Sequence, residues 1–453
     1  MMPFQKYIHK IFINNINKGI VLIKKSAVIA TLLFSASAMA SSPKFHQGRL
    51  IVKLKEGTLL PSSNLIKSSM HLFKNTYIVR TQNLTELKSD LESSSVVLSV
   101  NNDFYAKREA LPASVNPHKV AAGFNKDSGP FNDPKVSKLW GFKPSKKKGM
   151  NVFAAYENYD SSTSEKVIVA VVDTGVDYNH EDLKDVMWTN PGEIAGNGID
   201  DDGNGYIDDI HGINTLVRDS EGKATMDIMD GHSHGTHVSG TIGATQNNGK
   251  GIAGVASNVE IMGIRTVPNS SDETDVDVAE AFIYAAKNGA RVINCSFGKS
   301  HNEGGMLVKE VIDYIGKEYG VLVVAAAGNS SQNIDKKLTY PASFESENLL
   351  VVASNSKWGM SFFSNYGVKN VDVIAPGSSI YSTVPGSRYS SMSGTSMASP
   401  NTAGVAAEIL SRNPNLSAVQ LKNIIMDSVS KSRSFSTKVS SGGLVDLAAA
   451  VKL

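Results

Sequence analysis

A serine hydroxyl stands between small residues in the stretch SGTSMASP, residues 393–400, just where a helix is expected to begin. Gly394 lets the backbone approach a bound substrate closely, and Pro400 suits the first turn of a helix, where its missing N–H costs nothing. The positive end of the helix dipole would then favour negative charge beside Ser396. These features predict that Ser396 is a nucleophile at a helix N-terminus.

A serine hydroxyl is a weak nucleophile at neutral pH, so it needs a base and a carboxylate that orients the base. Asp173 ends an apolar run, residues 167–172, and so lies at the carboxyl end of an expected buried parallel strand. Open α/β sheets place ligand chemistry at such strand ends. His234 lies in a glycine-spaced stretch, residues 231–241, that also resembles a helix start. We therefore expect Asp173, His234 and Ser396 to act together.

The chain order Asp, His, Ser is that of the subtilisins. Three segments closely resemble the motifs of the subtilisin-like serine proteases: residues 173–175, 234–237 and 394–400. A fourth, residues 323–329, resembles the strand and turn that present the oxyanion-hole asparagine of this family. The resemblance spans roughly residues 130–451, and four motifs in order are far more specific than any one of them.

The resemblance implies a peptidase mechanism. Ser396 would attack the scissile carbonyl while His234 takes its proton, and Asp173 would hold the imidazole in the required tautomer. The side chain of Asn329 and the backbone N–H of Ser396 would stabilise the oxyanion. Taken singly, Asp173 and Asn329 could be ordinary turn residues, and Ser396 could be a helix N-cap. These separate interpretations do not explain why all the motifs occur together in one chain.

The resemblance also implies a substrate cleft. The end of a buried strand, residues 291–298, resembles the segment that pairs with extended substrate, and residues 326–328 would form the opposite wall of the first pocket. No acid or base lines this pocket, so we expect a neutral or apolar residue before the scissile bond. Asp272 and Glu273 at the rim have two interpretations: acids that favour basic residues further along the substrate, or a solvated loop, which is preferred. The expected substrate-binding residues are Ser296, Phe297, Gly298, Ala327, Gly328 and Thr339.

An acidic stretch, residues 197–209, matches the first half of the EF-hand calcium loop when counted from Asp200. Its twelfth position is His211, where an EF-hand has Glu, and no helix pair is expected around it. We therefore predict an insertion that holds a structural Ca²⁺; the alternative is an acidic loop without an ion, in which crowded carboxylates would repel. The expected ligands are Asp200, Asp202, Asn204, Tyr206, Asp208 and Asp209.

Three histidines offer a competing metal site. His232, His234 and His237 lie close together in the sequence, but their spacing is not H-E-x-x-H and no cysteine is near them. Zinc at these positions is therefore disfavoured.

The start of the chain has the features of a leader. Two lysines, 24 and 25, precede an apolar run, residues 27–34, and residues 38–40 end in a small-x-small pattern. We expect a signal peptide over residues 1–40 and secretion to the periplasm or beyond. No segment approaches the roughly 20 apolar residues of a membrane helix, so no membrane anchor is expected.

Residues 41–110 are expected to form a small α+β domain that weakly resembles the inhibitory propeptide of the family. A sheet of this size has little core, so it would depend on docking. Residues 103–110 would lie through the active site, with self-cleavage between Ala106 and Lys119. The expected elements are strands at 49–54, 76–80 and 96–100 and a helix at 84–93.

Residues 111–148 are expected to be a linker and the N-terminal arm of a catalytic domain, residues 149–453. This domain is predicted to have the α/β fold of the subtilisins, a doubly wound, mostly parallel sheet with helices on both faces. Besides the strands that carry the motifs, we expect strands at 259–264, 321–326, 349–353 and 371–374 and helices at 276–288, 306–318 and 417–428.

The net charge of +2 on 453 residues gives no reason to expect nucleic acid as a partner. Cys295 is the single cysteine, so stability outside the cell would rest on packing and calcium. The sequence predicts a secreted, monomeric serine endopeptidase that cleaves proteins, activates itself and is inhibited by its own propeptide. A catalytically silent peptide-binding relative and a calcium-dependent adhesion protein remain as alternatives; the motif residues argue against the first, and the single acidic loop against the second.

Overall fold

The computed structural model describes residues 44–106, 129–157, 164–271, 273–302 and 305–453. The expected signal peptide and most of the expected self-cleavage region lie outside the described residues. Residues 45–453 form one compact unit. Within the described ranges, we find no helix with the length and apolar character that crossing a membrane requires.

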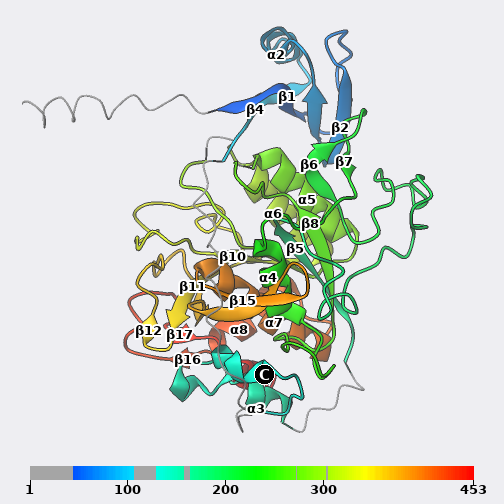
Figure 1. Ribbon diagram of the computed structural model, residues 1–453. Coiled ribbons are helices and arrows are strands. Elements are labelled where there is room, and N and C mark those ends of the chain that lie inside the picture. Colours follow the sequence, from blue (N-terminus) through cyan, green and yellow to red (C-terminus); the bar gives the residue numbers. More distant parts are fainter. Residues whose placement is uncertain (1–43, 107–128, 158–163, 272, 303–304) are drawn as a thin grey trace, which may run out of the picture. The chain divides into compact units, whose positions relative to one another are not determined.

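Eleven strands form a central, mostly parallel sheet (Figure 1). Ten lie in the order β16-β17-β13-β11-β10-β9-β5-β8-β6-β7, and β12 pairs with β11. The strands are β5 (Val167–Asp173), β6 (Asn214–Arg218), β7 (Ala224–Thr225), β8 (Val259–Arg265), β9 (Val292–Cys295), β10 (Leu322–Ala326), β11 (Leu349–Ser356), β12 (Gly359–Met360), β13 (Val373–Pro376), β16 (Ser430–Lys431) and β17 (Gly443–Leu444).

Helices cover both faces of this sheet because its central strands are apolar on both sides. In β5, Val169 and Val171 join the core under α4 (His234–Gly243), α7 (Thr395–Arg412) and α8 (Ala418–Asp427). Ala170 and Val172 join the core under α5 (Asp275–Lys287) and α6 (Leu307–Tyr319). The predicted doubly wound α/β fold is confirmed.

A second, antiparallel sheet is formed by β1 (Phe45–Leu54), β2 (Ser68–Phe73), β3 (Thr76–Arg80) and β4 (Val97–Phe104), in the order β2-β3-β1-β4. Residues 45–106 are called the N-terminal module below. Leu50 and Val52 of β1 pack under α2 (Leu84–Glu92), whereas Ile51 points to the other face and joins the core formed by α5 and α6. One face of this small sheet is therefore completed by the larger part of the molecule.

Residues 129–156, part of which we expected as an N-terminal arm, pack against the large sheet and contribute to its core. Phe131, Trp140 and Phe142 are buried in the core that contains α7. The Trp140 indole N–H donates to the carbonyl oxygen of Ser378 (3.1 Å). The segment comprises the 3-10 turns Val136–Lys138, Trp140–Phe142 and Ser145–Lys147 and the short helix α3 (Val152–Tyr156), which contacts α9 (Leu447–Ala450).

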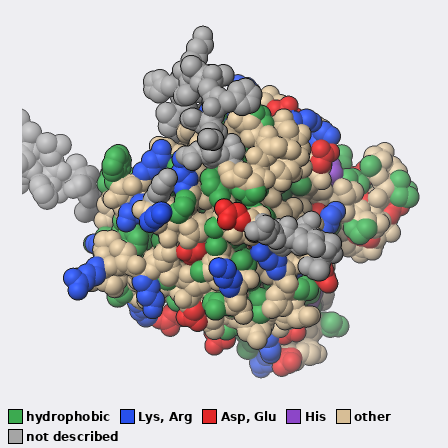
Figure 2. All heavy atoms as spheres, turned by 90° about the horizontal axis from the view of Figure 1, so that it is seen from below, with side chains coloured by type: hydrophobic (Ala, Val, Ile, Leu, Met, Phe, Trp, Pro, Cys, Tyr) green, Lys and Arg blue, Asp and Glu red, His purple; other side chains and the backbone are tan. Residues whose placement is uncertain are grey.

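The remaining strands, β14 (Ile380–Val384) and β15 (Arg388–Met392), form a separate hairpin that packs on α4. Figure 2 shows one face of the molecule, on which Lys and Arg side chains occur alongside Asp and Glu side chains. This mixed surface agrees with the small net charge of the chain.

Candidate active site

Asp173 and His234 meet at the carboxyl edge of the large sheet. Asp173 is the last residue of β5, and His234 is the first residue of α4. His234 Nδ1 lies 2.7 Å from Asp173 Oδ1, which also accepts the backbone N–H of Thr174 (2.7 Å). Both side chains are buried. Because the carboxylate can only accept, Nδ1 carries the proton in this contact, and Nε2 is left as the basic nitrogen.

The start of α4 is held by Asp230, which the sequence interpretation did not select. One carboxylate oxygen of Asp230 accepts the backbone N–H groups of His232 (2.8 Å) and Ser233 (2.9 Å) and the hydroxyl of Thr174 (2.9 Å). The other accepts the backbone N–H (3.0 Å) and hydroxyl (2.6 Å) of Thr236. This buried carboxylate therefore joins the end of β5 to the first turn of α4, and an acid just before a helix start was the available signal.

Glycine is needed where α4 meets β5. A Cβ atom on Gly235 would lie 2.0 Å from the carbonyl oxygen of Gly175 and 3.1 Å from Asp173 Cβ. Gly175 itself has φ +105°, a conformation that favours glycine. These two glycines allow the short approach that brings the imidazole of His234 to the carboxylate of Asp173.

Ser396 lies in the first turn of α7 and is only 4% exposed. Its hydroxyl donates to the backbone oxygen of Ser296 (2.9 Å), and the Ser296 hydroxyl donates to the backbone oxygen of Ser396 (3.0 Å). Among the described residues, His234 Nε2 has no hydrogen-bond partner, so no hydrogen bond joins it to Ser396 in this state. Helices α4 and α7, which carry His234 and Ser396 in their first turns, pack against each other.

Asn329 lies next to the start of α7. Its Oδ1 accepts the backbone N–H (2.8 Å) and the hydroxyl (3.0 Å) of Thr395, and Thr395 Oγ1 accepts the backbone N–H of Gly328 (3.0 Å). The structure thus brings Asn329 to the residue before Ser396. Gly328, with φ +100°, makes the turn that places it there.

A second asparagine shapes this turn, and no motif in the sequence pointed to it. Asn365 is buried; its Nδ2 donates to the Ala327 oxygen (2.9 Å) and its backbone N–H to the Gly328 oxygen (2.9 Å). Its Oδ1 accepts the backbone N–H groups of Ser330 and Gln332, each at 3.0 Å. One side chain therefore ties down the residues on both sides of Asn329.

The expected substrate-binding residues line one region. Ser296 and Phe297 follow β9 and are buried, and a Cβ on Gly298 would lie 2.9 Å from the Tyr340 oxygen. Residues Lys299 and Tyr340 form an antiparallel bridge with reciprocal backbone bonds of 2.8 Å. This bridge brings Thr339 to the side of Phe297–Gly298, and Ala327 and Thr339 are both buried.

The chain itself occupies part of this region. Tyr105 forms an antiparallel bridge with Thr274, and the Ala106 N–H donates to the Glu273 oxygen (2.7 Å). Ala106 also lines a cavity of about 20 Å³ together with Phe297 and Gly298. Glu273 is buried, so its interpretation as part of a solvated loop is wrong. Asp272 lies outside the described residues.

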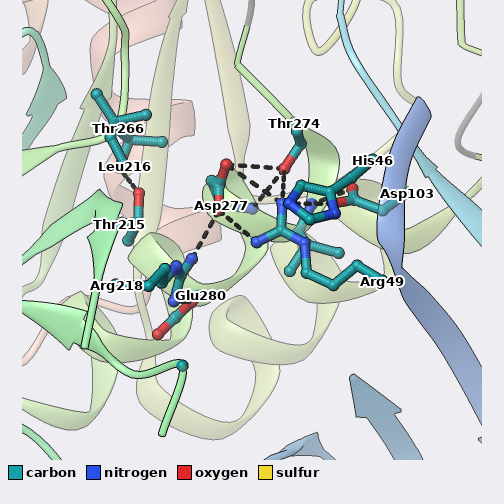
Figure 3. Close-up of polar contacts among 12 residues, drawn as sticks. His46, Arg49, Asp103, Thr215, Leu216, Arg218, Thr266, Thr274, Asp277 and Glu280 are labelled. Atoms are coloured by element: carbon teal, nitrogen blue, oxygen red, sulfur yellow. Dashed lines mark hydrogen bonds and ion pairs between the residues drawn. The ribbon is translucent and has the colours of Figure 1, made fainter. Parts of the chain in front are cut away.

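A polar cluster joins the N-terminal module to α5 (Figure 3). Arg49 of β1 forms buried ion pairs with Asp103 of β4 (2.5 Å) and with Asp277 of α5 (2.9 Å), and it donates to the hydroxyl of Thr274 (2.8 Å). Arg218 of β6 pairs with the same Asp277 (2.6 Å). Arg49 therefore links two strands of the module to the first turn of α5.

The two carboxyl groups on Arg49 differ in acidity. Burial raises the pKa of Asp103 to about 6, and the Arg49 guanidinium only partly offsets this effect. Burial acts in the same direction on Asp277, but Arg49 and Arg218 together outweigh it, so the pKa of Asp277 is lowered. Arg218, which pairs with Asp277 but not with Asp103, therefore accounts for the difference between the two carboxyl groups.

The acidic loop brings three carboxylates close enough to share an ion. Oxygens of Glu193, Asp200 and Asp202 lie within 4.8 Å of one another. Asp200 and Asp202 were expected ligands, whereas Glu193 was missed because it precedes the EF-hand-like pattern. Glu193 also accepts the backbone N–H groups of Asp201 (2.9 Å) and Asp208 (3.0 Å). Hard carboxylate oxygens of this kind fit Ca²⁺.

The other expected ligands have protein partners. Asp208 accepts the backbone N–H groups of residues 196–198 at 2.7 to 3.2 Å. Asp209 accepts Nδ2 of Asn204 (3.0 Å), and the Tyr206 hydroxyl points to Glu280 (3.2 Å). Burial, opposed by its hydrogen bonds, raises the pKa of Asp209 to about 6. Glu193 thus joins two of the expected ligands, Asp200 and Asp202, in one carboxylate group, and the hydrogen bonds of Asp208 and Asp209 brace the loop around it.

The three histidines do not gather around a common point. His234 contacts Asp173, and the ring of His237 donates from Nε2 to the Ile380 oxygen (2.9 Å). Burial lowers the pKa of His237 to about 3, so it is neutral. Among the described residues, the acidic group around Glu193 is the one cluster with metal-ligand geometry.

Comparisons with known proteins agree with this geometry. "Subtilisin-like protease 1" of Plasmodium berghei is 33% identical over 378 residues, which are 79% of this chain and 59% of that protein. "Thermophilic serine proteinase" of Bacillus sp. strain AK1 is 39% identical over 248 residues, which are 54% of this chain and 53% of that protein. The chain thus spans less than two thirds of the length of these relatives.

A solved structure and a family model extend the comparison. The crystal structure of fervidolysin from Fervidobacterium pennivorans, described as a keratinolytic enzyme related to subtilisin, has a TM-score of 0.68 with this chain. The match covers 92% of this chain and 62% of that one at 24% identity, so it supports the fold. The model of the subtilase family matches residues 164–444, more than half of the chain. This protein belongs to the subtilase family.

Proposed function

We propose that this protein is a serine endopeptidase in which Asp173, His234 and Ser396 form the catalytic triad. The observation that carries the proposal is the buried contact of His234 Nδ1 with Asp173 Oδ1, in a helix that packs against the helix of Ser396. Such a contact fixes the imidazole tautomer and leaves Nε2 to take a proton from a serine.

The nucleophile has to turn before it reacts. In the described state the Ser396 hydroxyl donates to the Ser296 oxygen, and His234 Nε2 has no partner among the described residues. A rotation about the Cα–Cβ bond of Ser396 would exchange the first contact for a hydrogen bond to Nε2. Ser396 Oγ then attacks the substrate carbonyl, and His234 later passes the proton to the leaving amine.

Asn329 and the backbone N–H of Ser396 would stabilise the oxyanion. Asn329 Oδ1 is engaged by Thr395, so the NH₂ end of the amide is the end that would donate to the oxyanion. Two donors held by the protein before the reaction stabilise developing negative charge without reorganisation.

The N-terminal module would act as an inhibitory propeptide, and the enzyme would activate itself by cutting after it. The bridge of Tyr105 with Thr274 and the contact of Ala106 with Glu273 support this role, since they add the end of the module to the rim of the cleft as a strand. The ion pairs of Arg49 provide a second attachment outside the cleft. The chain leads from Ala106 into the predicted cleavage region.

The substrates would be proteins or peptides with a neutral residue before the scissile bond, because the walls formed by Ala327, Gly328 and Thr339 carry no charge. We further propose secretion after cleavage near Ala40 and a monomeric mature enzyme.

Self-processing tests the enzyme directly. We would express the parent chain and the Ser396→Ala chain, add a fluorophosphonate probe to each, and measure intact masses. The parent should lose a segment the size of the N-terminal module and gain one probe, whereas Ser396→Ala should do neither. A folded parent chain that is neither processed nor labelled would instead support the silent peptide-binding alternative.

A structural Ca²⁺ at Glu193, Asp200 and Asp202 would stabilise the acidic loop. The three carboxylates provide negative charge that a divalent cation would neutralise. A chelator should therefore lower the melting temperature of the parent, and Glu193→Gln should reduce the calcium-dependent part of that temperature. Asp219→Asn, which lies outside this group, serves as the control. Melting that is insensitive to chelator would refute the ion.

A further inference from the structure

Two of the most exposed aromatic side chains lie on one hairpin beside the Asn329 turn. Trp358 is 94% exposed and Phe362 is 91% exposed. Trp358 sits in the tight turn between β11 and β12, where Ser356 pairs with Gly359. Large aromatic side chains this exposed leave apolar surface in water that a partner would cover.

Backbone hydrogen bonds join this hairpin to two neighbouring segments. The Ser331 N–H donates to the Phe363 oxygen (2.8 Å) and its hydroxyl to the Phe362 oxygen (2.6 Å). Ile334 N–H donates to the Tyr366 oxygen (2.8 Å). These bonds place residues 331–334 beside residues 362–366. The same three segments, residues 331–338, 356–363 and 366–370, also expose Leu338 and Val368.

The charges on this surface are mostly positive. The three segments contain four lysines and one carboxylate, Asp335. Asp335 accepts the backbone N–H groups of Lys369 and Asn370, and Lys369 pairs with Glu345 (2.5 Å). Among the described residues, the other three lysines have no carboxylate partner: Lys336, Lys337 and Lys357. We call the following residues the aromatic–lysine face: Lys336, Lys337, Leu338, Lys357, Trp358, Phe362 and Val368.

We propose that the aromatic–lysine face docks on the surface of an anionic phospholipid membrane. Tryptophan and phenylalanine insert at the boundary between headgroups and acyl chains, and nearby lysines are attracted to acidic headgroups. The whole chain has a net charge of only +2, so the attraction comes from this local excess of lysine rather than from the overall charge. A nucleic acid would pair with the lysines but would leave Leu338 and Val368 uncovered.

Docking would place the proposed catalytic site close to the lipid. The hairpin strand continues into Asn365, which donates to the backbone oxygens of Ala327 and Gly328. The face that contacts lipid and the turn that carries Asn329 are thus parts of one hydrogen-bonded unit. Proteins at a membrane surface would be presented to the cleft.

Tryptophan fluorescence can test this docking because two of the three tryptophans are inaccessible. Trp140 is 5% exposed and Trp188 is 3% exposed, so a response to vesicles reports on Trp358. The Ser396→Ala chain without residues 1–40, which should retain the N-terminal module, is titrated with vesicles of phosphatidylglycerol and phosphatidylethanolamine or of phosphatidylcholine alone. We expect a shift of emission to shorter wavelength with the anionic vesicles only, and its loss in high salt.

Variants distinguish this face from other contacts. Replacing Lys336, Lys337 or Lys357 by Gln should weaken vesicle binding about fivefold per lysine, and Phe362→Ala should weaken it further. The matched controls are Lys317→Gln and Leu59→Ala, which change exposed side chains elsewhere and should leave binding unchanged. Thermal melting of each variant checks that it is folded.

Three outcomes would overturn the proposal: no emission change with anionic vesicles, an equal change with phosphatidylcholine, or binding that is unaffected by the lysine variants. A fourth outcome would show that the face contacts the peptide substrate instead of lipid. If Phe362→Ala in the active chain lowers kcat/KM for a short soluble peptide while vesicle binding is unchanged, the face is a substrate contact and not a lipid contact. This peptide assay also separates failure of the lipid proposal from failure of the enzyme.

Discussion

The backbone N–H of Thr395 donates to Oδ1 of Asn329 over 2.8 Å, and this contact sets the orientation of the Asn329 amide. A backbone N–H can only donate, so the atom that receives it must be the amide oxygen. The NH₂ group of Asn329 consequently points away from Thr395, the residue before the proposed nucleophile Ser396. A residue of the helix that carries Ser396 thus positions the proposed oxyanion donor.

Replacement of Asn329 should lower turnover without a comparable change in KM. Asn329→Ala removes a donor that acts on the transition state, and we expect kcat to fall by about 10²–10³, the loss known for such a donor in a subtilisin, a relative of this protein. Steady-state kinetics on a peptide substrate would measure this. The matched control is Asn333→Ala in the same loop, which should leave kcat nearly unchanged; equal loss in both variants would contradict the role of Asn329.

Replacement of Asp230 should impair both stability and turnover. Asp230→Asn has one acceptor oxygen where the carboxylate has two, so the contact that Oδ2 makes with the backbone N–H of Thr236 is lost. Hydrogen bonds to a charged group contribute about 1.5–3 kcal/mol each, and we expect the free energy of unfolding to fall by about 2 kcal/mol. Asp227→Asn, an exposed acid three residues earlier, should change little in a denaturant titration. A parent-like kcat in Asp230→Asn would show that the helix start tolerates the loss.

Arg49 and Lys53 offer a matched test of how the N-terminal module is attached. Both lie on β1 and pair with a carboxylate outside the module, but the Arg49 pairs are buried whereas the pair of Lys53 with Glu310 is partly exposed. In the Ser396→Ala chain, Arg49→Met leaves Asp103 and Asp277 without this cation and should cost about 3–5 kcal/mol. Lys53→Met should cost less than about 1 kcal/mol. Denaturant titration would measure the loss of unfolding free energy in each variant, and hydrogen exchange of β1 in the native state would show whether the module loosens. Equal losses in the two variants would refute the special role of Arg49.

The attachment of the module should depend on the protonation of Asp103. Burial in the docked state raises the pKa of Asp103 to about 6. In a released module the same carboxyl group would return to its ordinary, lower pKa. Between these two values, Asp103 is protonated in the docked state and ionised in the released state. This contribution is therefore fully present at low pH and is lost as pH rises through about 6. Burial and then Arg49 lower the pKa of His46, which acts in the opposite direction.

A variant isolates the contribution of Asp103 from that of His46. The unfolding free energy of the Ser396→Ala chain, minus that of the same chain with Asp103→Asn, should fall by about 1 kcal/mol between about pH 5 and about pH 7. Denaturant titrations at a series of pH values would measure the difference. Parallel pH profiles for the two chains would contradict the assignment.

Cys295 should be unreactive in the folded protein although it ends the strand beside the cleft. It is fully buried, and burial raises the pKa of its thiol, so almost no thiolate is present at neutral pH. Iodoacetamide should modify the chain only after denaturation, as mass spectrometry would detect. Rapid labelling of the native protein would instead reveal that β9 opens readily.

The sequence predicted the interior of the fold because burial leaves a local pattern. The strand expected at 76–80 is β3 (Thr76–Arg80), and the helix expected at 276–288 is α5 (Asp275–Lys287). Strand β2 (Ser68–Phe73) was not predicted, because its residues show little apolar alternation. One of its side-chain contacts is far away in the sequence: the ring of Phe73 lies 5.3 Å from that of Tyr314 in α6, measured between centroids.

The candidate site likewise contains residues that the sequence predicted and residues that it did not. Asp173, His234, Asn329 and Ser396 belong to motifs and were predicted, whereas Asn365 was not. The Asn365 side chain binds backbone groups of residues 327–332, more than thirty positions earlier, and no local pattern records such a contact. Glu193 was missed for a related reason, since it lies outside the repeating pattern that suggested calcium.

The bridge between Tyr105 and Thr274 has a consequence for aggregation. An unpaired strand edge recruits other chains, yet a rim that receives substrate by strand addition must become unpaired at some stage. Here Thr274 is also the N-cap of α5, so the edge ends where the helix begins. An edge this short can accept one passing chain, but it offers no template on which a sheet could grow from molecule to molecule.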